Sequence, residues 1–370
     1  MYYEDRKPKR GIFLIYLLMV VIIGLFLILI LKIDGNTANI NSNYDVNKLS
    51  SEIKKEDEKK DTTFIQKAVK GIVGISKIKQ NDSSIFMENS EIKLGLGSGV
   101  IVTENGYILT NQHVVGEKYS TCYVTLENGE IFNGNVVWTD KNIDLAIVKI
   151  STTGLNYLQL ADSDNINLAD EVYAIGNPIG FEFQRTVTKG IISGINRTLK
   201  IENDKESSYM EDLIQTDATI NEGNSGGALI NTNGELIGIN SVKITDAEGI
   251  GFAVPINLVK PIIEKLIADG KFEEAYLGIY GYDKNVIPYL NSNIDINSGV
   301  YIAKVLYDGP MLGAGLIEGD IITKIDGNSI EKMNDLKKYI YTKNPGDTVN
   351  LTIRRNGKDY TADVKLGRKI

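Results

Sequence analysis

The chain has 370 residues, enough for two or three domains, and its 42% hydrophobic and 24% charged residues are typical of a globular protein. A net charge of −8 gives no basic face for nucleic acid. The single cysteine, Cys122, excludes an intramolecular disulfide, and the single histidine, His113, excludes zinc sites with several histidines.

The N-terminus carries a membrane signal. Residues 1–10 contain four basic side chains and precede an uncharged apolar run over residues 11–31. A helix needs about 20 apolar residues to span a bilayer, whereas a cleaved signal peptide has a shorter apolar core and a small-residue cleavage site. No such site directly follows Leu31. We therefore expect a single-pass signal anchor in the cell membrane, with residues 1–10 in the cytoplasm and the chain after Lys32 on the extracytoplasmic side.

Four segments of different composition follow the anchor. Residues 32–61 are polar and charged, as in a solvated linker. Residues 62–256 consist mostly of short β runs separated by Gly, Asn and Asp, which predicts a barrel or sandwich. Residues 257–270 have the apolar spacing of a connecting helix, and residues 271–370 mix short strands with one helix near Met333–Thr342.

A serine stands among glycines in the stretch Glu222-Gly223-Asn224-Ser225-Gly226-Gly227. Glycines allow a sharp turn that exposes the serine hydroxyl and leaves backbone N–H groups free, as stabilisation of an oxyanion requires. Taken alone, the same stretch suits an ordinary β-turn equally well.

Two further residues complete a catalytic pattern with Ser225. A serine hydroxyl needs a base, and His113 is the only imidazole in the chain. Asp144 opens a strongly apolar strand, where a partly buried carboxylate needs a partner such as a histidine N–H. The order His, Asp, Ser is that of the chymotrypsin-type double barrel. The pattern predicts a triad of nucleophile, base and orienting carboxylate that needs no metal or organic cofactor.

Seven short stretches resemble the protease domain of the HtrA/Deg family of serine proteases. They are Gly97–Ile101, Thr110–Val115, Asp144–Ala146, Gly176–Pro178, Gln215–Ala218, Gly223–Gly227 and Gly249–Pro255. The downstream unit resembles the PDZ domain of this family in two stretches, Tyr276-Leu277-Gly278-Ile279 and residues 309–327.

The resemblance implies a mainly β chain: a chymotrypsin-like double β-barrel protease domain, then a small α+β PDZ domain, after an N-terminal transmembrane helix. It implies that the loop Gly223, Asn224 and Ser225 forms the oxyanion hole, and that Thr219 and Ile220 line the substrate pocket. Residues 276–279 would hold the carboxylate of a C-terminal peptide. The family also implies a homotrimer.

We expect a serine endopeptidase that cleaves misfolded or exposed segments of extracytoplasmic proteins, in quality control or regulatory processing. A chaperone or adaptor that holds unfolded chains through the PDZ domain is the alternative, although it would not need an intact triad. The expected base of the substrate pocket has no acidic residue, which predicts small or medium aliphatic residues before the cut bond rather than Lys or Arg.

Regulation is a further hypothesis. The polar, charged segment Thr198–Glu211 lies shortly before the nucleophile. In the family, the loop that it resembles relays occupancy of the PDZ domain to the oxyanion loop. Either a C-terminal peptide orders the oxyanion loop in this way, or the PDZ domain only tethers substrate.

Overall fold

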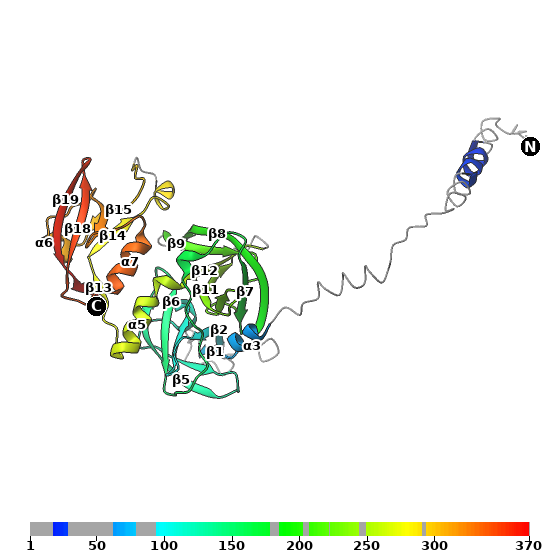
Figure 1. The fold of residues 1–370 in the computed structure, drawn as a ribbon, viewed down its shortest axis with the longest axis horizontal. Coiled ribbons are helices and arrows are strands. Elements are labelled where there is room, and N and C mark those ends of the chain that lie inside the picture. Colours follow the sequence, from blue (N-terminus) through cyan, green and yellow to red (C-terminus); the bar gives the residue numbers. More distant parts are fainter. Residues whose placement is uncertain are drawn as a thin grey trace, which may run out of the picture. The chain divides into compact units, whose positions relative to one another are not determined.

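The computed structural model describes residues 18–28, 62–78, 94–177, 185–202, 207–221, 223–243, 249–290 and 294–369 (Figure 1). The chain divides into two compact units, residues 1–61 and residues 62–370. Each unit is described by itself below.

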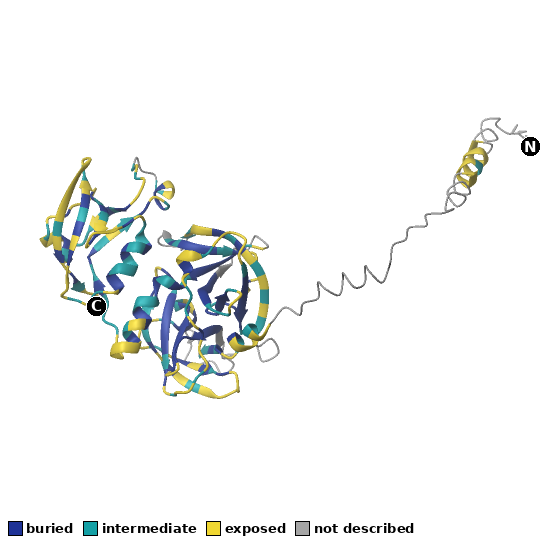
Figure 2. Cartoon of the chain, viewed as in Figure 1, coloured by how far each residue is buried: buried dark blue, intermediate teal, exposed yellow. Residues whose placement is uncertain are grey.

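In the first unit, residues 18–28 form a helix whose apolar side chains are mostly exposed (Figure 2). The rest of the predicted anchor, residues 11–17 and 29–31, and the linker up to residue 61 lie outside the described residues. Among the helices described, none is long and apolar enough to cross a membrane.

The second unit begins with a closed antiparallel barrel in the order β1–β2–β3–β6–β5–β4. Its strands are β1 (Ile72–Ile78), β2 (Leu94–Ile101), β3 (Tyr107–Thr110), β4 (Thr121–Thr125), β5 (Ile131–Asp140) and β6 (Leu145–Ile150). Helix α3 (Thr63–Val69) precedes β1, and the one-turn helix α4 (Gln112–Val115) follows β3. Burial alternates along β4, so that Cys122 and Val124 face the apolar interior. Burial raises the pKa of the Cys122 thiol to about 11, which keeps it neutral and unreactive.

A second closed antiparallel barrel follows, in the order β10–β11–β12–β9–β8–β7. Its strands are β7 (Glu171–Gly176), β8 (Thr186–Glu202), β9 (Ser207–Thr216), β10 (Ala228–Ile230), β11 (Leu236–Lys243) and β12 (Gly251–Pro255), with the 3-10 turn η1 (Ser163–Asn165) before β7. One apolar cluster contains side chains of both barrels, such as Leu109 and Ile147 of the first and Ile175 and Ile239 of the second. The predicted mainly β fold is confirmed.

The segment Thr198–Glu211, which we expected to be a loop, is largely a β hairpin. Strand β8 continues to Glu202 and β9 starts at Ser207, with Leu199 paired to Met210. The sequence did not indicate these strands, because charged residues alternate with the apolar side chains that anchor them. Both apolar residues pack on the main core cluster, which explains why the strands extend so far.

A 3-10 turn, η3 (Ile256–Leu258), leads into helix α5 (Lys260–Asp269), close to where the sequence predicts a connecting helix. Pro261 lies in its first turn, where its missing N–H costs nothing. Gly270 ends the helix in the left-handed conformation, with φ +68°. Ile262, Ile263 and Leu266 bury the apolar face of the helix in the main core cluster.

The C-terminal domain is a small sheet with one long helix. Its sheet runs β14–β15–β16–β18–β19, β17 pairs with β16, and β13 pairs with β20. The strands are β13 (Ala275–Tyr276), β14 (Ile279–Tyr282), β15 (Val300–Val305), β16 (Ile321–Ile325), β17 (Asn328–Ser329), β18 (Thr348–Arg355), β19 (Lys358–Lys365) and β20 (Gly367–Arg368). The helical segments are η4 (Ile287–Tyr289), α6 (Pro310–Gly313) and α7 (Met333–Tyr341). Leu336 and Ile340 of α7 pack in the core of this domain.

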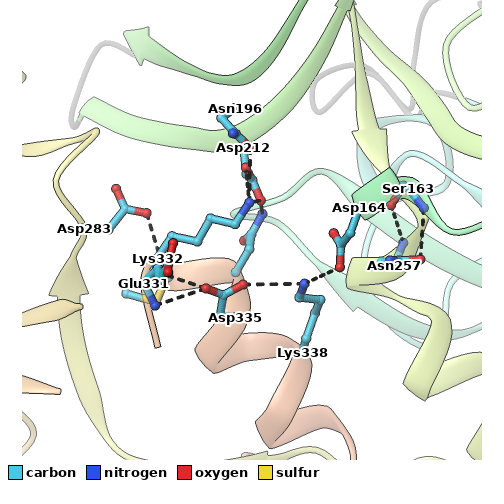
Figure 3. Close-up of polar contacts among 12 residues, drawn as sticks. Ser163, Asp164, Asn196, Asp212, Asn257, Asp283, Glu331, Lys332, Asp335 and Lys338 are labelled. Carbon is cyan, nitrogen blue, oxygen red and sulfur yellow. Dashed lines mark hydrogen bonds and ion pairs between the residues drawn. The ribbon is translucent and has the colours of Figure 1, made fainter. Parts of the chain in front are cut away.

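Other side chains, on α7 or next to it, contact both barrels, and Figure 3 shows the polar contacts to the second barrel. Lys332 Nζ lies 2.7 Å from Asp212 Oδ2, and Lys338 Nζ lies 2.9 Å from Asp164 Oδ2. At the end of the helix, Tyr341 packs edge-on against Trp138. Polar and aromatic contacts thus hold the C-terminal domain against the barrels.

Candidate active site

His113 is held by Asp144. The short helix α4 after β3 carries His113, and its ring Nδ1 lies 2.8 Å from Asp144 Oδ2 and 3.0 Å from Oδ1. The backbone N–H of His113 also donates to Asp144 Oδ1, at 3.0 Å. Because the carboxylate accepts only, this contact places the proton of a neutral imidazole on Nδ1 and leaves Nε2 as the basic nitrogen. The histidine side chain is 53% exposed, so a substrate can reach it.

The carboxylate of Asp144 is fixed by residues that the sequence did not single out. Asp144 precedes β6 with φ +52°, in the left-handed region that Asp tolerates better than most residues. Its carbonyl accepts from Asn111 Nδ2 at 2.8 Å, and its Oδ2 accepts from Ser241 Oγ at 2.9 Å. Both Asn111 and Ser241 are buried. These contacts aim the carboxylate at the histidine ring.

Ser225 reaches the same site through Ser241. Its Oγ donates to the carbonyl of Ser241 at 3.2 Å, while the Ser241 hydroxyl binds Asp144. The described residues show no hydrogen bond between Ser225 and His113. Catalytic hydrogen bonds are often long or misaligned before substrate binds, so this geometry is compatible with a catalytic pair.

The loop around Ser225 needs glycine. Gly223 has φ +95° and Gly226 has φ +82°, which L side chains rarely adopt. A Cβ at Gly226 would also clash with the carbonyl oxygen of Ser98. Within the described part of the chain, the N–H groups of Gly223 and Ser225 donate to no other residue. The N–H of Asn224 donates to Asn221 O at 3.0 Å, so this residue offers no free backbone donor.

The two residues predicted to line the substrate pocket differ in exposure. Thr219 is exposed, and its carbonyl accepts from Thr188 Oγ1 at 2.9 Å. Ile220 is only 3% exposed and belongs to the apolar core of the second barrel, where it covers Gly251. The side chain of Thr219 is therefore the one that a substrate can reach directly.

The segment Tyr276–Ile279 connects β13 to β14 in the C-terminal domain. The carbonyls of Leu277 and Gly278 accept from the N–H groups of Met311 and Leu306. Their own N–H groups have no partner among the described residues, which leaves two adjacent donors for an anion. Elsewhere in the described ranges, no group of three or more His, Cys, Asp or Glu side chains could hold a metal ion.

Comparisons with known proteins give the family. Residues 97–239 match the trypsin-like peptidase domain and residues 275–366 match the PDZ domain. The chain is 40% identical over 336 residues to Serine protease Do-like HtrA of Bacillus subtilis (strain 168), which covers 85% of this chain and 74% of that protein. The chain belongs to the HtrA-type serine protease family.

Other relatives agree with this membership in the HtrA-type family. The periplasmic pH-dependent serine endoprotease DegQ of Escherichia coli (strain K12) is 37% identical over 278 residues, 74% of this chain and 59% of that protein. The solved HtrA-type protease AlgW with decapeptide has a TM-score of 0.60 at 30% identity, over 83% of this chain and 98% of that one. The serine endoprotease from Yersinia pestis has a TM-score of 0.55 at 33% identity, over 84% and 98% of the two chains. The prediction of an HtrA/Deg serine endopeptidase with a PDZ domain is confirmed.

Proposed function

We propose that this HtrA-type protease cleaves exposed segments of extracytoplasmic proteins, misfolded ones included, through a triad of Ser225, His113 and Asp144. The observation that carries the proposal is the double contact between the His113 ring and the Asp144 carboxylate, with Ser225 tied to the same carboxylate through Ser241. This arrangement leaves Nε2 of the histidine free to act as a base.

In the reaction, the Ser225 hydroxyl exchanges its bond to Ser241 O for one to His113 Nε2. Its Oγ attacks the substrate carbonyl while Nε2 takes the proton, and Asp144 stabilises the imidazolium. The N–H groups of Gly223 and Ser225 stabilise the oxyanion. The imidazolium then protonates the leaving amine, and a water molecule, deprotonated by the same Nε2, releases the acyl group and restores Ser225.

A fluorophosphonate probe tests the nucleophile directly. It phosphonylates an activated serine, so mass spectrometry of the digested protein should locate the label on Ser225. The label should disappear in His113→Ala, because the hydroxyl then has no base. Labelling of another serine, or undiminished labelling of His113→Ala, would exclude the proposed triad.

The substrate pocket is proposed to take small or medium aliphatic residues before the cut bond. Thr219, the exposed residue of the predicted pair, is uncharged, so a buried Lys or Arg would lack a counter-charge there. Ile220 supports the pocket from the core of the second barrel.

The PDZ domain is proposed to bind C-terminal peptides at residues 276–279. The free N–H groups of Leu277 and Gly278 support this, since PDZ domains capture a terminal carboxylate with backbone donors. At the other end of β14, the ring of Tyr282 packs edge-on against Tyr209 of the β8–β9 hairpin, with ring centroids 6.3 Å apart. Through this contact, peptide bound along β14 would bias the hairpin and hence the oxyanion loop.

Location and assembly are proposed from the sequence and the family. We infer a membrane anchor at residues 11–31, both domains on the extracytoplasmic side, and a homotrimer. The periplasmic name of the Escherichia coli relative supports the location. The full chain should resist extraction by carbonate, and protease added to intact protoplasts should digest it beyond Lys32. A protected C-terminal part would reverse the topology.

A further inference from the structure

Ser98 of strand β2 makes four hydrogen bonds next to the active site and is completely buried. Its hydroxyl donates to the carbonyl of Gly223 at 2.5 Å and accepts from the N–H of Asn177 at 2.6 Å. Its own N–H donates to the carbonyl of Ser225 at 2.9 Å. Its carbonyl accepts from Thr110 Oγ1 at 2.6 Å, three residues before His113. One residue of the first barrel thus contacts the nucleophile loop of the second barrel twice.

These side-chain contacts are not part of the sheet. In the β1–β2 ladder Ser98 lies opposite Gly74, and none of the four hydrogen bonds described above joins these two residues. The hydroxyl instead bridges two loops that come 79 and 125 residues later in the chain. An alanine would fill this buried position in the strand without the cost of burying a hydroxyl. The hydroxyl therefore serves to bond the two loops and is not needed for packing in the barrel.

The peptide unit between Gly223 and Asn224 is held at both ends. Ser98 Oγ binds its carbonyl, and Asn221 O binds its N–H. A peptide unit is rigid, so fixing its two ends restricts the two torsions that join it to its neighbours, ψ of Gly223 and φ of Asn224. Those neighbouring units carry the N–H groups of Gly223 and Ser225, the two donors that are free. Without the hydroxyl, Gly223 could rotate its peptide with little steric resistance.

We propose that Ser98 is a positioning residue for catalysis, whose hydroxyl holds the Gly223–Asn224 peptide so that the N–H groups of Gly223 and Ser225 meet the oxyanion. The inference rests on the function proposed above, in which these N–H groups stabilise the transition state. It adds a residue of the first barrel to an oxyanion hole whose two N–H donors both belong to the second barrel. Donors that are fixed in advance stabilise developing charge without reorganising, which is the source of their effect on rate.

The competing explanation is that Ser98 only satisfies two buried backbone groups and so stabilises the fold. Kinetics separate the two roles, because a positioning residue affects the transition state more than the bound substrate. Ser98→Ala should lower kcat per active site with KM unchanged, whereas lost stability alone should lower only the number of active sites.

The test uses the full chain with Ser98→Ala and, as a matched control, Thr103→Val. The Thr103 hydroxyl is also buried in the first barrel and accepts from the N–H of Tyr107 at 2.9 Å, in the turn between β2 and β3. Titration with a fluorophosphonate counts active sites, and a short chromogenic peptide gives kcat and KM. A peptide aldehyde, which forms a tetrahedral adduct with the catalytic serine, reports binding of the oxyanion.

For Ser98→Ala we expect kcat per titrated site to fall about 10- to 100-fold, while KM stays within about twofold of wild type. This fall in kcat is no larger than the fall caused by removing one oxyanion donor. The aldehyde should bind more weakly by a similar factor. Thr103→Val should change none of these values. A wild-type kcat per site for Ser98→Ala, or an equal fall for Thr103→Val, would overturn the proposal.

If Ser98→Ala yields no folded protein, Ser98→Cys is measured in the same way. Its thiol fills the position but is a weak donor, so kcat should still fall, and a wild-type kcat would overturn the proposal. Ser225→Ala separates this inference from the proposed function. An active Ser225→Ala would remove the proposed triad, whereas an inactive Ser225→Ala beside a fully active Ser98→Ala would remove only the role of Ser98.

Discussion

We expect Glu211 to make the stability of the folded chain sensitive to pH. It lies on β9, where Asn334 of α7 approaches its carbonyl at 3.5 Å. Its Oε2 atom is shut off from solvent and has no hydrogen-bond partner among the described residues. Burial, together with the nearby carboxylates of Asp283 and Asp212, raises the pKa of Glu211 from 4.5 to about 8. At neutral pH the folded protein therefore keeps this carboxyl protonated.

The sign of the effect follows from the two pKa values. Between pH 4.5 and about 8 the folded chain holds a proton on Glu211 that the unfolded chain releases. The contribution of Glu211 to the free energy of unfolding is therefore fully present below pH 4.5, declines as the pH rises, and is lost above about pH 8. Each pH unit in this window is worth about 1.4 kcal/mol, and relaxation around a buried charge reduces the total to on the order of 3 kcal/mol.

Glu211→Gln removes the charge while it keeps the shape of the protonated side chain. We expect the variant to unfold with a free energy close to that of wild type at pH 5, and to be more stable than wild type at pH 9 by on the order of 3 kcal/mol. Urea denaturation followed by fluorescence of Trp138 suits the measurement, because this single tryptophan packs on Tyr341 of the PDZ domain.

The matched control is Glu104→Gln, which removes an exposed carboxylate from the turn between β2 and β3. It should leave the pH dependence of the unfolding free energy as in wild type. Parallel pH profiles for wild type and Glu211→Gln between pH 5 and 9 would refute the reasoning, since they would mean that Glu211 titrates alike in the folded and unfolded chain.

Three further predictions concern contacts described above. Tyr341→Phe should lower the free energy of unfolding by about 1–3 kcal/mol in urea denaturation, because it leaves the buried Asp140 without the hydroxyl that now lies 3.1 Å from its Oδ2; an unchanged midpoint would contradict this. Ser241→Ala should lower kcat about tenfold at constant KM, because Asp144 loses the hydroxyl that orients it, and a wild-type kcat would show that the other contacts suffice. Cleavage sites mapped by mass spectrometry on a denatured protein mixture should follow Val, Ala or Ile, whereas cuts mainly after Lys or Arg would contradict the uncharged pocket at Thr219.

The residues of the proposed triad could be predicted because each stands in a local stretch of unusual composition. Ser225 lies among glycines, Asp144 opens an apolar strand, and His113 has no rival in the chain. Ser98 and Ser241 could not be assigned a role from the sequence. Their partners lie 125 and 97 residues away, so only the closed barrels bring them together.

The fold shows the same division between local and distant information. Short strands and the helix near residues 257–270 follow from periodicity and turn residues, and α5 ends at Gly270 as the sequence indicates. The β8–β9 hairpin could not be predicted from periodicity, because pairing between Leu199 and Met210 depends on the apolar core beneath them. Likewise, nothing near Lys332 in the sequence indicates its bond to Asp212, 120 residues earlier.

The central claim, that Ser225 and His113 act as one catalytic unit, is tested most directly by hydrolysis of casein. Wild type, Ser225→Ala, His113→Ala and the double variant are compared at equal concentrations of folded protein. We expect both single variants to fall to near background and the double variant to be scarcely lower, because members of a triad contribute as a unit. Substantial turnover by either single variant, or a double variant far below both, would contradict the account.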